Sequence, residues 1–191
     1  MIVWKVVPDF RFRSFLASDP DRTEVFEVEY TRELVKCSPM LQAWRPLRLF
    51  AESPRLKMGN FARSWGGGFL LDARARSVMS PLLDSTVEFL PFLPYEGEVL
   101  HLLNVLECVD CLDEVRTKYV TDKETGAKLA EILEYHFLPE RLSWPPLFRL
   151  PKRSALFALT RHASIKEEFK AVFEREGLTG LKFEKLWSDG K

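Results

Sequence analysis

The chain has 191 residues, of which 46% are hydrophobic and 29% are charged, so it can bury one sizeable core and does not have the composition of a disordered protein. Lysine and arginine together number 28, as do aspartate and glutamate, so the formal net charge is zero. A neutral chain has no global positive field to attract nucleic acid or an anionic membrane. We therefore expect a single domain over residues 1–191 that binds neither.

The N-terminus and the cysteines predict the compartment. Residues 1–8 form an apolar run that is too short for a secretion signal. No stretch approaches the roughly 20 apolar residues that a membrane-spanning helix needs. The three cysteines, Cys37, Cys108 and Cys111, are an odd and sparse set, which is typical of a reducing compartment. These features predict a soluble cytoplasmic protein.

The first third of the chain predicts two strands and long loops. Residues 2–7 are β-branched or aromatic and indicate a strand that is buried on both faces. Residues 26–30 alternate between apolar residues and the acidic Glu27 and Glu29, which favours a half-buried strand. Between residues 32 and 58 the pattern is irregular, and only residues 47–50 suggest a short extended piece.

A glycine run at residues 66–68 suggests a hinge between an irregular N-terminal part, residues 1–66, and a more regular C-terminal part, residues 67–191. Asp72 then predicts the N-cap of a helix over residues 73–83, where apolar residues recur at helical spacing. Residues 87–92 and 99–106 predict two strands that pair as a hairpin.

The next segment is less regular. The acidic residues 109–116 suggest one or two helical turns, and residues 121–126 have the composition of an exposed loop tip. Residues 129–137 fit either a helical stripe or a strand in which Leu133, Tyr135 and Phe137 share a face, and we favour the strand. Short strands are expected at residues 147–150 and 155–159.

The C-terminal region predicts a helix followed by a strand. Residues 164–167 read as a capping box, and Gly177 suits the position after the helix end. In the strand that follows, Leu181, Phe183 and Trp187 are expected on one face. Hairpins with segregated helices predict an α+β fold of mixed or antiparallel sheets.

Two patterns could carry chemistry, a cysteine pair and a glycine run. Cys108 and Cys111 form a Cys-x-x-Cys pair, which suggests a redox site or, with His101, His136 or Cys37, a zinc site. The nearby acidic residues disfavour a reactive thiol, and no second ligand pair has zinc spacing, so two semi-buried thiols are the simpler interpretation. The glycine run lacks the rest of a phosphate-binding motif, and no acid–base pair or nucleophile motif is present. We expect no catalysis, no metal and no cofactor.

Charge is unevenly distributed along the chain. One acidic stretch contains Glu27 and Glu29, and a second runs from Glu107 to Glu114. A basic stretch contains Arg45, Arg48, Arg55, Lys57, Arg63, Arg74 and Arg76. Opposed patches on a neutral protein either steer a protein partner or face each other within the fold.

Several short motifs resemble a known family. They are Leu103-Asn104-Val105, then Asp110, Leu112 and Asp113, then Leu147-Phe148-Arg149-Leu150-Pro151, and finally Gly177-Leu178-Thr179-Gly180-Leu181-Lys182-Phe183 with Trp187. This set resembles immunity-protein family eleven of bacterial polymorphic toxin systems. The closing stretch is its most specific part, and the resemblance covers residues 69–187. The chain departs from the family pattern in having Cys108 and Cys111.

The resemblance implies a small cytoplasmic α+β protein for interbacterial competition, which binds the toxin encoded by a neighbouring gene and protects the producing cell. It implies neither catalysis nor a cofactor, and it assigns no contact residues. If the toxin is a nuclease with a basic cleft, one of two acidic sets is the predicted contact surface: either the face with Glu27 and Glu29, or the cluster of Glu107, Asp110, Asp113 and Glu114. The alternative function is an enzyme that reverses a toxin's modification, or a thiol or zinc protein using Cys108 and Cys111.

Overall fold

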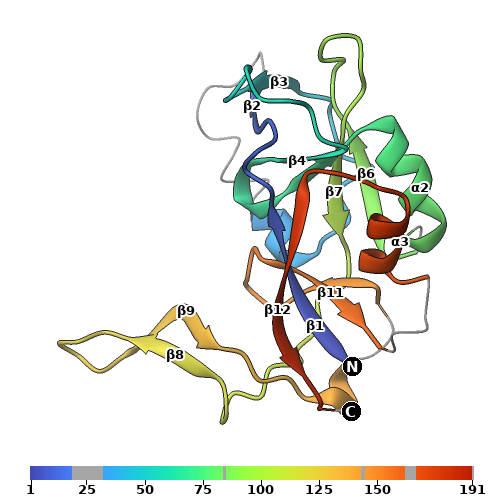
Figure 1. The fold of residues 1–191 in the computed structure, drawn as a ribbon. Coiled ribbons are helices and arrows are strands. Elements are labelled where there is room, and N and C mark those ends of the chain that lie inside the picture. The colour runs from blue at the N-terminus through green and yellow to red at the C-terminus, as the bar shows by residue number, and fades with distance from the viewer. Residues whose placement is uncertain (19–31, 84, 143–144, 162–166, 191) are drawn as a thin grey trace.

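The computed structural model describes residues 1–191 except 19–31, 84, 143–144, 162–166 and 191. The described residues form two four-stranded sheets and two two-stranded ones, and every strand pair is antiparallel. The first sheet has the order β10 (Leu147–Arg149), β11 (Leu156–Thr160), β1 (Ile2–Pro8), β12 (Leu181–Ser188). The second has the order β4 (Phe61–Arg63), β5 (Phe69–Leu71), β7 (His101–Val105), β6 (Val87–Pro91). Together with short helices they give a sheet-dominated α+β fold, as Figure 1 shows.

The remaining elements are short. The two-stranded sheets pair β2 (Phe15–Ser18) with β3 (Arg48–Ala51) and β8 (Lys118–Thr121) with β9 (Lys128–Glu134). The helices are α2 (Ala73–Leu83) and α3 (Phe169–Arg175), and the 3-10 turns are η1 (Trp65–Gly67) and η2 (Pro139–Arg141). The predicted strand at residues 26–30, with Glu27 and Glu29, lies outside the described residues. Strand β2 was not predicted.

Strand β1 confirms the first predicted element and lies between β11 and β12. Val3 and Val6 are buried on opposite faces of the sheet, since Val3 packs into one apolar cluster and Val6 into another. The other residues of β1 are only half-buried, so the expectation of complete burial on both faces is wrong. The strand thus separates two cores.

The final strand does not keep Leu181, Phe183 and Trp187 on one face, contrary to the prediction. Its pairing with β1 shifts register between Val3 and Trp4, as at a β-bulge. An extra residue there reverses the alternation, so Phe183 packs with Val6 and Trp187 packs with Val3, in different clusters. The bulge lets one strand contribute to both cores.

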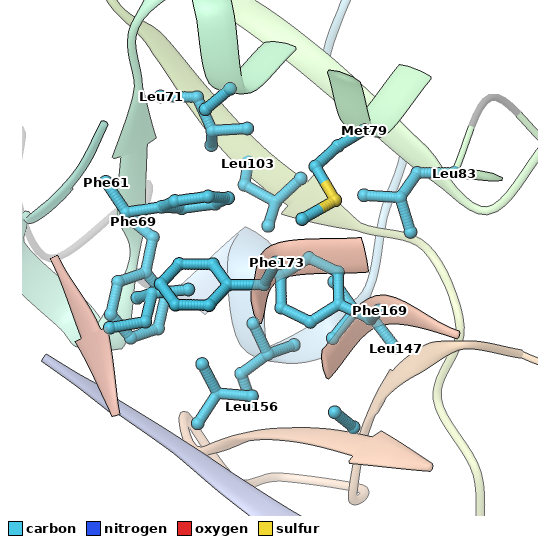
Figure 2. Packing of buried hydrophobic residues seen from close by; sticks show 14 of the residues in the cluster. Phe61, Phe69, Leu71, Met79, Leu83, Leu103, Leu147, Leu156, Phe169 and Phe173 are labelled. Atoms are coloured by element: carbon cyan, nitrogen blue, oxygen red, sulfur yellow. The ribbon is translucent and has the colours of Figure 1, made fainter. Parts of the chain in front are cut away.

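Helix α2 forms as predicted. The Asp72 carboxylate accepts a hydrogen bond from the backbone N–H of Ala75 at 2.7 Å, which satisfies one of the free N–H groups at the helix start. Ala75, Met79 and Leu83 are buried at the spacing of one helix face. That face covers the apolar cluster of Figure 2, where Met79, Leu83, Phe169 and Phe173 gather.

The predicted hairpin at residues 87–106 is confirmed as β6 and β7. All five residues of β7 are buried, because Leu103 and Val105 face one cluster and Leu102 faces another. The glycine run forms the turn between the paired strands β4 and β5. Strands from both sides of the predicted boundary between residues 66 and 67 therefore belong to one sheet.

Helix α3 begins later than the capping box predicts. Its N-cap is Glu168 in an extended conformation, without a side-chain cap, and residues 162–166 lie outside the described part. The Glu168 carboxylate instead accepts a hydrogen bond from the backbone N–H of Arg161 at 2.7 Å, which draws it away from the helix. The predicted end is confirmed, since Gly177 has a φ of 61° and Leu178 N–H bonds Phe173 O at 3.0 Å.

Two other predictions concern the region of β8 and β9. The one or two helical turns expected at residues 109–116 are present as a single turn, in which Thr117 N–H donates to Asp113 O at 2.8 Å and the Asp113 carboxylate accepts hydrogen bonds from the N–H groups of Val115 and Arg116, both at 3.1 Å. The strand favoured for residues 129–137 is confirmed over Lys128–Glu134.

The C-terminal motif joins the last part of the chain to the start of β4 and α2. Asn60 Oδ1 accepts hydrogen bonds from the N–H and hydroxyl of Thr179 at 3.1 and 3.0 Å. Asn60 Nδ2 donates to Asp72 Oδ2 at 2.8 Å, and Phe61 N–H donates to Thr179 O at 2.9 Å. We call this set the Asn60–Thr179 junction.

Gly180 makes the closest backbone approach in this junction. It has a φ of 99°, and a Cβ there would overlap the Phe61 carbonyl oxygen and lie 2.7 Å from its carbon. The backbone carbonyl of Gly180 also accepts a hydrogen bond from Asp9 N–H at 3.0 Å. Only glycine fits, because both the space and the left-handed conformation exclude a side chain.

We predict that Gly180→Ala lowers the free energy of unfolding by about 2 to 5 kcal/mol, the combined cost of an unfavourable φ and an overpacked contact. Gly97→Ala is the matched control, since Gly97 has a φ of 86° with nothing within 4 Å of its Cβ position. It should lose only about 1 to 2 kcal/mol. Urea denaturation measures both, and equal losses would contradict the steric explanation.

The ionisation of Asp9, which lies beside this junction, predicts that the stability of the folded protein depends on pH. Hydrogen bonds from the Arg11 side chain, the shortest 2.6 Å, lower the pKa of Asp9 to about 2, and the carboxylate is only 4% exposed. Folding therefore favours the ionised form, and this stabilisation is present above the ordinary pKa of 3.8 and is lost as the pH falls towards 2. The stability advantage of the wild type over Asp9→Asn should shrink over that range in acid titrations followed by urea. Exposed Asp110→Asn is the control, and a pH-independent difference for Asp9→Asn would refute the assignment.

Candidate functional site

Strands β8 and β9 form a hairpin that projects from the body of the protein, as Figure 1 shows at its lower left. We call these strands and the tip between them the arm. The tip is built by Asp122, whose carboxylate accepts hydrogen bonds from the N–H and hydroxyl of Thr125 at 2.7 and 2.8 Å. This confirms the predicted loop tip at residues 121–126.

The arm and its base expose large aliphatic side chains. Val115, at the base, is 94% exposed, while Leu133 and Leu129 on β9 are 67% and 45% exposed. No residue of β9 is fully buried. Large aliphatic side chains that are exposed on a projecting element are candidates for a binding surface.

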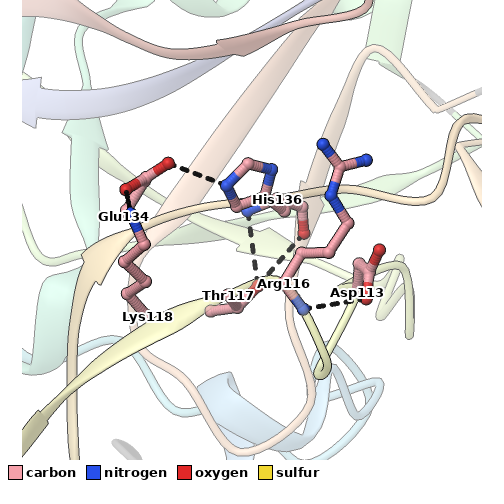
Figure 3. A network of polar contacts seen from close by, with 6 residues as sticks. All are labelled: Asp113, Arg116, Thr117, Lys118, Glu134 and His136. Carbon is pink, nitrogen blue, oxygen red and sulfur yellow. Dashed lines mark hydrogen bonds and ion pairs between the residues drawn. The ribbon is translucent and has the colours of Figure 1, made fainter.

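The base of the arm is held by a polar network, drawn in Figure 3. Glu134 bridges Lys118 Nζ at 2.5 Å and His136 Nε2 at 2.8 Å, which links the two strands where they leave the body. Hydrogen bonds with Lys118 and His136 lower the pKa of Glu134, and the bond with Lys118 has the larger effect. Thr117 and His136 exchange hydrogen bonds at 3.3 Å. The network fixes the direction in which the arm leaves.

Tyr119 connects the arm to its surroundings. Its hydroxyl donates to Glu114 Oε2 at 2.6 Å, and the cationic groups of Lys128 and Arg153 lie 5.1 and 5.7 Å from its ring centre. Burial, followed by the bond to Glu114, raises the pKa of this tyrosine. Arg153 also donates to the backbone of Ala130 at 2.5 Å, so a residue of the body braces β9. The contacts with Glu114 and Arg153 therefore attach the arm to the neighbouring parts of the protein.

The arm also has free strand edges. Within the described residues, β8 and β9 pair only with each other, so each leaves one edge without a neighbouring strand. Unpaired N–H and C=O groups on such edges are available to a strand of another chain. The exposed aliphatic side chains and the free edges together make the arm the candidate protein-binding site.

Of the two acidic sets predicted as contact surfaces, Glu27 and Glu29 lie outside the described residues, and the four residues of the cluster from Glu107 to Glu114 have different surroundings. Asp110 lies 3.6 Å from Arg141, and Asp113 uses its carboxylate to hold a local turn. Glu114 accepts the hydrogen bond of Tyr119, and Glu107 is only half-buried, with its backbone bonded to Arg149. Among them, Asp113 and Glu114 lie at the base of the arm.

The cysteine pair is divided by burial. Cys108 is exposed, whereas Cys111 is fully buried in the cluster with Leu112 and Phe137, and this burial raises its pKa to about 12. Within the described ranges, no three His, Cys, Asp or Glu side chains converge as a metal site would require. The structure does not bring Cys108 and Cys111 together with the histidines.

The histidines have other contacts. His101 Nε2 lies 2.9 Å from an Arg76 guanidinium nitrogen, and burial together with that charge lowers the pKa of His101. This pair lines a surface hollow of about 910 Å³ over α2 with Ser77 and Ser80. A guanidinium so close to the ring opposes the approach of a metal cation.

Comparisons with known proteins add no relative: no protein-family model matches the chain, and no curated protein matches it. In the described part of the chain, no helix combines the length and the apolar character needed to cross a membrane.

Sequence reasoning missed the aliphatic side chains of the arm. The strand pattern placed Leu133 on one face with Tyr135 and Phe137, yet Phe137 is 3% exposed and Leu133 is 67% exposed. The reason is that β9 runs from the tip back towards the body, so Leu133 precedes the point at which the chain rejoins the body at His136, whereas Phe137 follows it. A signal was present in the sequence, because charged residues flank Leu129 and Leu133 closely on β9.

We predict that Leu133→Ser changes the free energy of unfolding by no more than about 0.5 kcal/mol, because an exposed side chain loses little on truncation. Phe137→Ala, just past the end of the same strand, should lose about 3 to 5 kcal/mol through the cavity it leaves. Phe137 packs against Trp187 with ring centres 5.9 Å apart. Urea unfolding compares the two, and a large loss for Leu133→Ser would show that the arm packs against the body.

Proposed function

We propose that this chain is an immunity protein that binds a cognate bacterial toxin and neutralises it by steric occlusion, with the arm as the centre of the contact. The observation that carries the proposal is a braced hairpin with exposed aliphatic side chains and free edges. The resemblance of the C-terminal motifs to immunity-protein family eleven supplies the class of partner. On this proposal the protein acts in the cytoplasm and needs no cofactor.

The chemistry of the arm favours apolar contact over simple charge attraction. Between residues 118 and 134 it carries Lys118, Lys123 and Lys128 against Asp122, Glu124, Glu131 and Glu134, so its charges nearly balance. Buried aliphatic or aromatic anchors supply most of the affinity of protein interfaces, while the surrounding charges govern orientation and rate. The balanced charges therefore suit a rim around Leu129 and Leu133.

The shape of the arm suits occlusion. A projecting two-stranded element can enter a cleft that the flat face of a globular body cannot reach. A stable interface buries about 1,200 to 2,000 Å² in total, more than so narrow an element offers by itself, so we expect the adjoining body around Val115 and Glu114 to complete it. Because Arg153 and Glu134 already hold the arm, little conformational entropy is lost on binding.

We predict that Leu133→Asp abolishes protection and weakens complex formation at least about 30-fold, the effect of losing roughly 2 kcal/mol at an apolar anchor. The test is co-expression of the chain with the product of its neighbouring gene in a sensitive host, followed by copurification and affinity measurement. Leu16→Asp is the matched control, since Leu16 is 42% exposed on β2, far from the arm in Figure 1.

Three results would count against the proposal in different ways. If the wild type neither rescues growth nor binds the toxin, the immunity function is removed. Rescue without a complex favours an enzyme that reverses the toxin's modification. Equal binding by Leu133→Asp and the wild type leaves immunity intact but removes the arm from the interface.

A further inference from the structure

The fold brings Cys37 and Cys108 together, although they are far apart in the sequence. Asn104 at the end of β7 donates a hydrogen bond to the backbone carbonyl of Ser38 at 2.9 Å, which anchors the segment that carries Cys37. The chain then leaves β7 and reaches Cys108, which forms an isolated bridge with Arg149. The thiol of Cys37 lies near enough to Cys108 and Arg149 to interact electrostatically with both.

The guanidinium of Arg149 interacts with this pair, and no carboxylate of the described residues compensates its charge. Arg149 is 0% exposed and forms no ion pair with any described acidic side chain. One of its terminal nitrogens donates to the Ser154 carbonyl, but its Nε has no partner among the described residues. The groups that interact electrostatically with it are the sulfur atoms of Cys37 and Cys108. A buried cation without a counter-ion is costly, and a sulfur anion there would reduce that cost.

The two thiols differ in access, which gives each a distinct part in an exchange reaction. Cys108 is exposed, so a soluble reagent can reach its sulfur. Cys37 is only 7% exposed, and burial, followed by the neighbouring Cys108, raises its pKa to about 12. Glu107 contributes to this increase in the pKa, whereas Arg149 opposes it. Cys37 is therefore a protonated thiol that only Cys108 can engage.

We propose that Cys37 and Cys108 are a redox pair that closes to an intramolecular disulfide on exposure to a small-molecule disulfide, with Arg149 stabilising the sulfur anion formed during the exchange. This inference is independent of the proposed binding function. It differs from the Cys-x-x-Cys hypothesis, because its second thiol comes from a distant part of the sequence and Cys111 has no part in it.

The reaction proceeds in two balanced steps. The Cys108 thiolate attacks one sulfur of the small disulfide, forms a mixed disulfide and releases the first small thiolate. The Cys37 sulfur then attacks the Sγ of Cys108, the protein disulfide forms, and the second small thiolate leaves. The two protons of Cys37 and Cys108 end on the two small thiols. The protein loses two electrons, and the small disulfide gains them.

The test is incubation of the reduced, folded protein with oxidised glutathione, followed by an acid quench, alkylation of remaining thiols under denaturing conditions and mass spectrometry of the intact chain and its peptides. The reduced protein has three alkylatable thiols. After oxidation we expect one, with a peptide link between Cys37 and Cys108. Three remaining thiols, a mixed disulfide at Cys108 that never resolves, or a link between Cys108 and Cys111 would each overturn the proposal.

Variants separate the steps. Cys37→Ser should stop at the mixed disulfide on Cys108, whereas Cys111→Ala should still form the link between Cys37 and Cys108. Arg149→Met should slow disulfide formation, while Arg55→Met, the matched control at an exposed arginine outside the arm, should leave the rate unchanged. Equal rates in both arginine variants would remove Arg149 from the mechanism. Because the wild type alone decides whether the disulfide forms, a variant that fails to fold does not prevent a decision.

Discussion

The Asn60–Thr179 junction is the constraint on which the arrangement of the two large sheets depends. Asn60 leads into β4 of one sheet, while Thr179 precedes β12 of the other. Gly180 allows the two backbones to approach closely enough for the Phe61–Thr179 hydrogen bond of 2.9 Å. With that distance fixed, the aromatic rings of Phe61, Phe169 and Phe173 meet, and the ring centres of Phe169 and Phe173 lie 6.0 and 5.8 Å from that of Phe61.

The parts of the fold that could be predicted from the sequence are those governed by local patterns. Asp72 and the spacing of Ala75 and Met79 define α2 without help from the rest of the chain, and the turn composition after β6 defines its hairpin. The errors arise where tertiary contacts decide. Trp187 changes face because β12 bulges against β1, and the carboxylate of Glu168 bonds the chain before the helix instead of capping it.

The candidate site could be predicted only in part, for a related reason. Charge can be counted along a sequence, but whether a carboxylate is available depends on its neighbours: Asp113 holds a turn, and Glu114 is bonded to Tyr119. Whether an aliphatic side chain is exposed cannot be deduced from the local sequence pattern, because it depends on the tertiary structure around that side chain. Leu133 and Phe137 read alike in the sequence, and they differ because Leu133 lies before, and Phe137 after, the point at which the chain returns from the arm to the body at His136.

Cys108 of the proposed redox pair and the arm lie on one continuous stretch of chain, and its anchoring explains how both are positioned. After Cys108, the N–H of Val109 bonds the carbonyl of Arg149 at 2.9 Å, and Cys111 enters the apolar cluster. Asp113 N–H then bonds the carbonyl of His136 at 2.9 Å, where the arm returns to the body. Few regular elements are present here, so backbone bonds to the neighbouring segments fix the path. The same anchoring that holds Cys108 beside Arg149 therefore sets the base from which the arm projects.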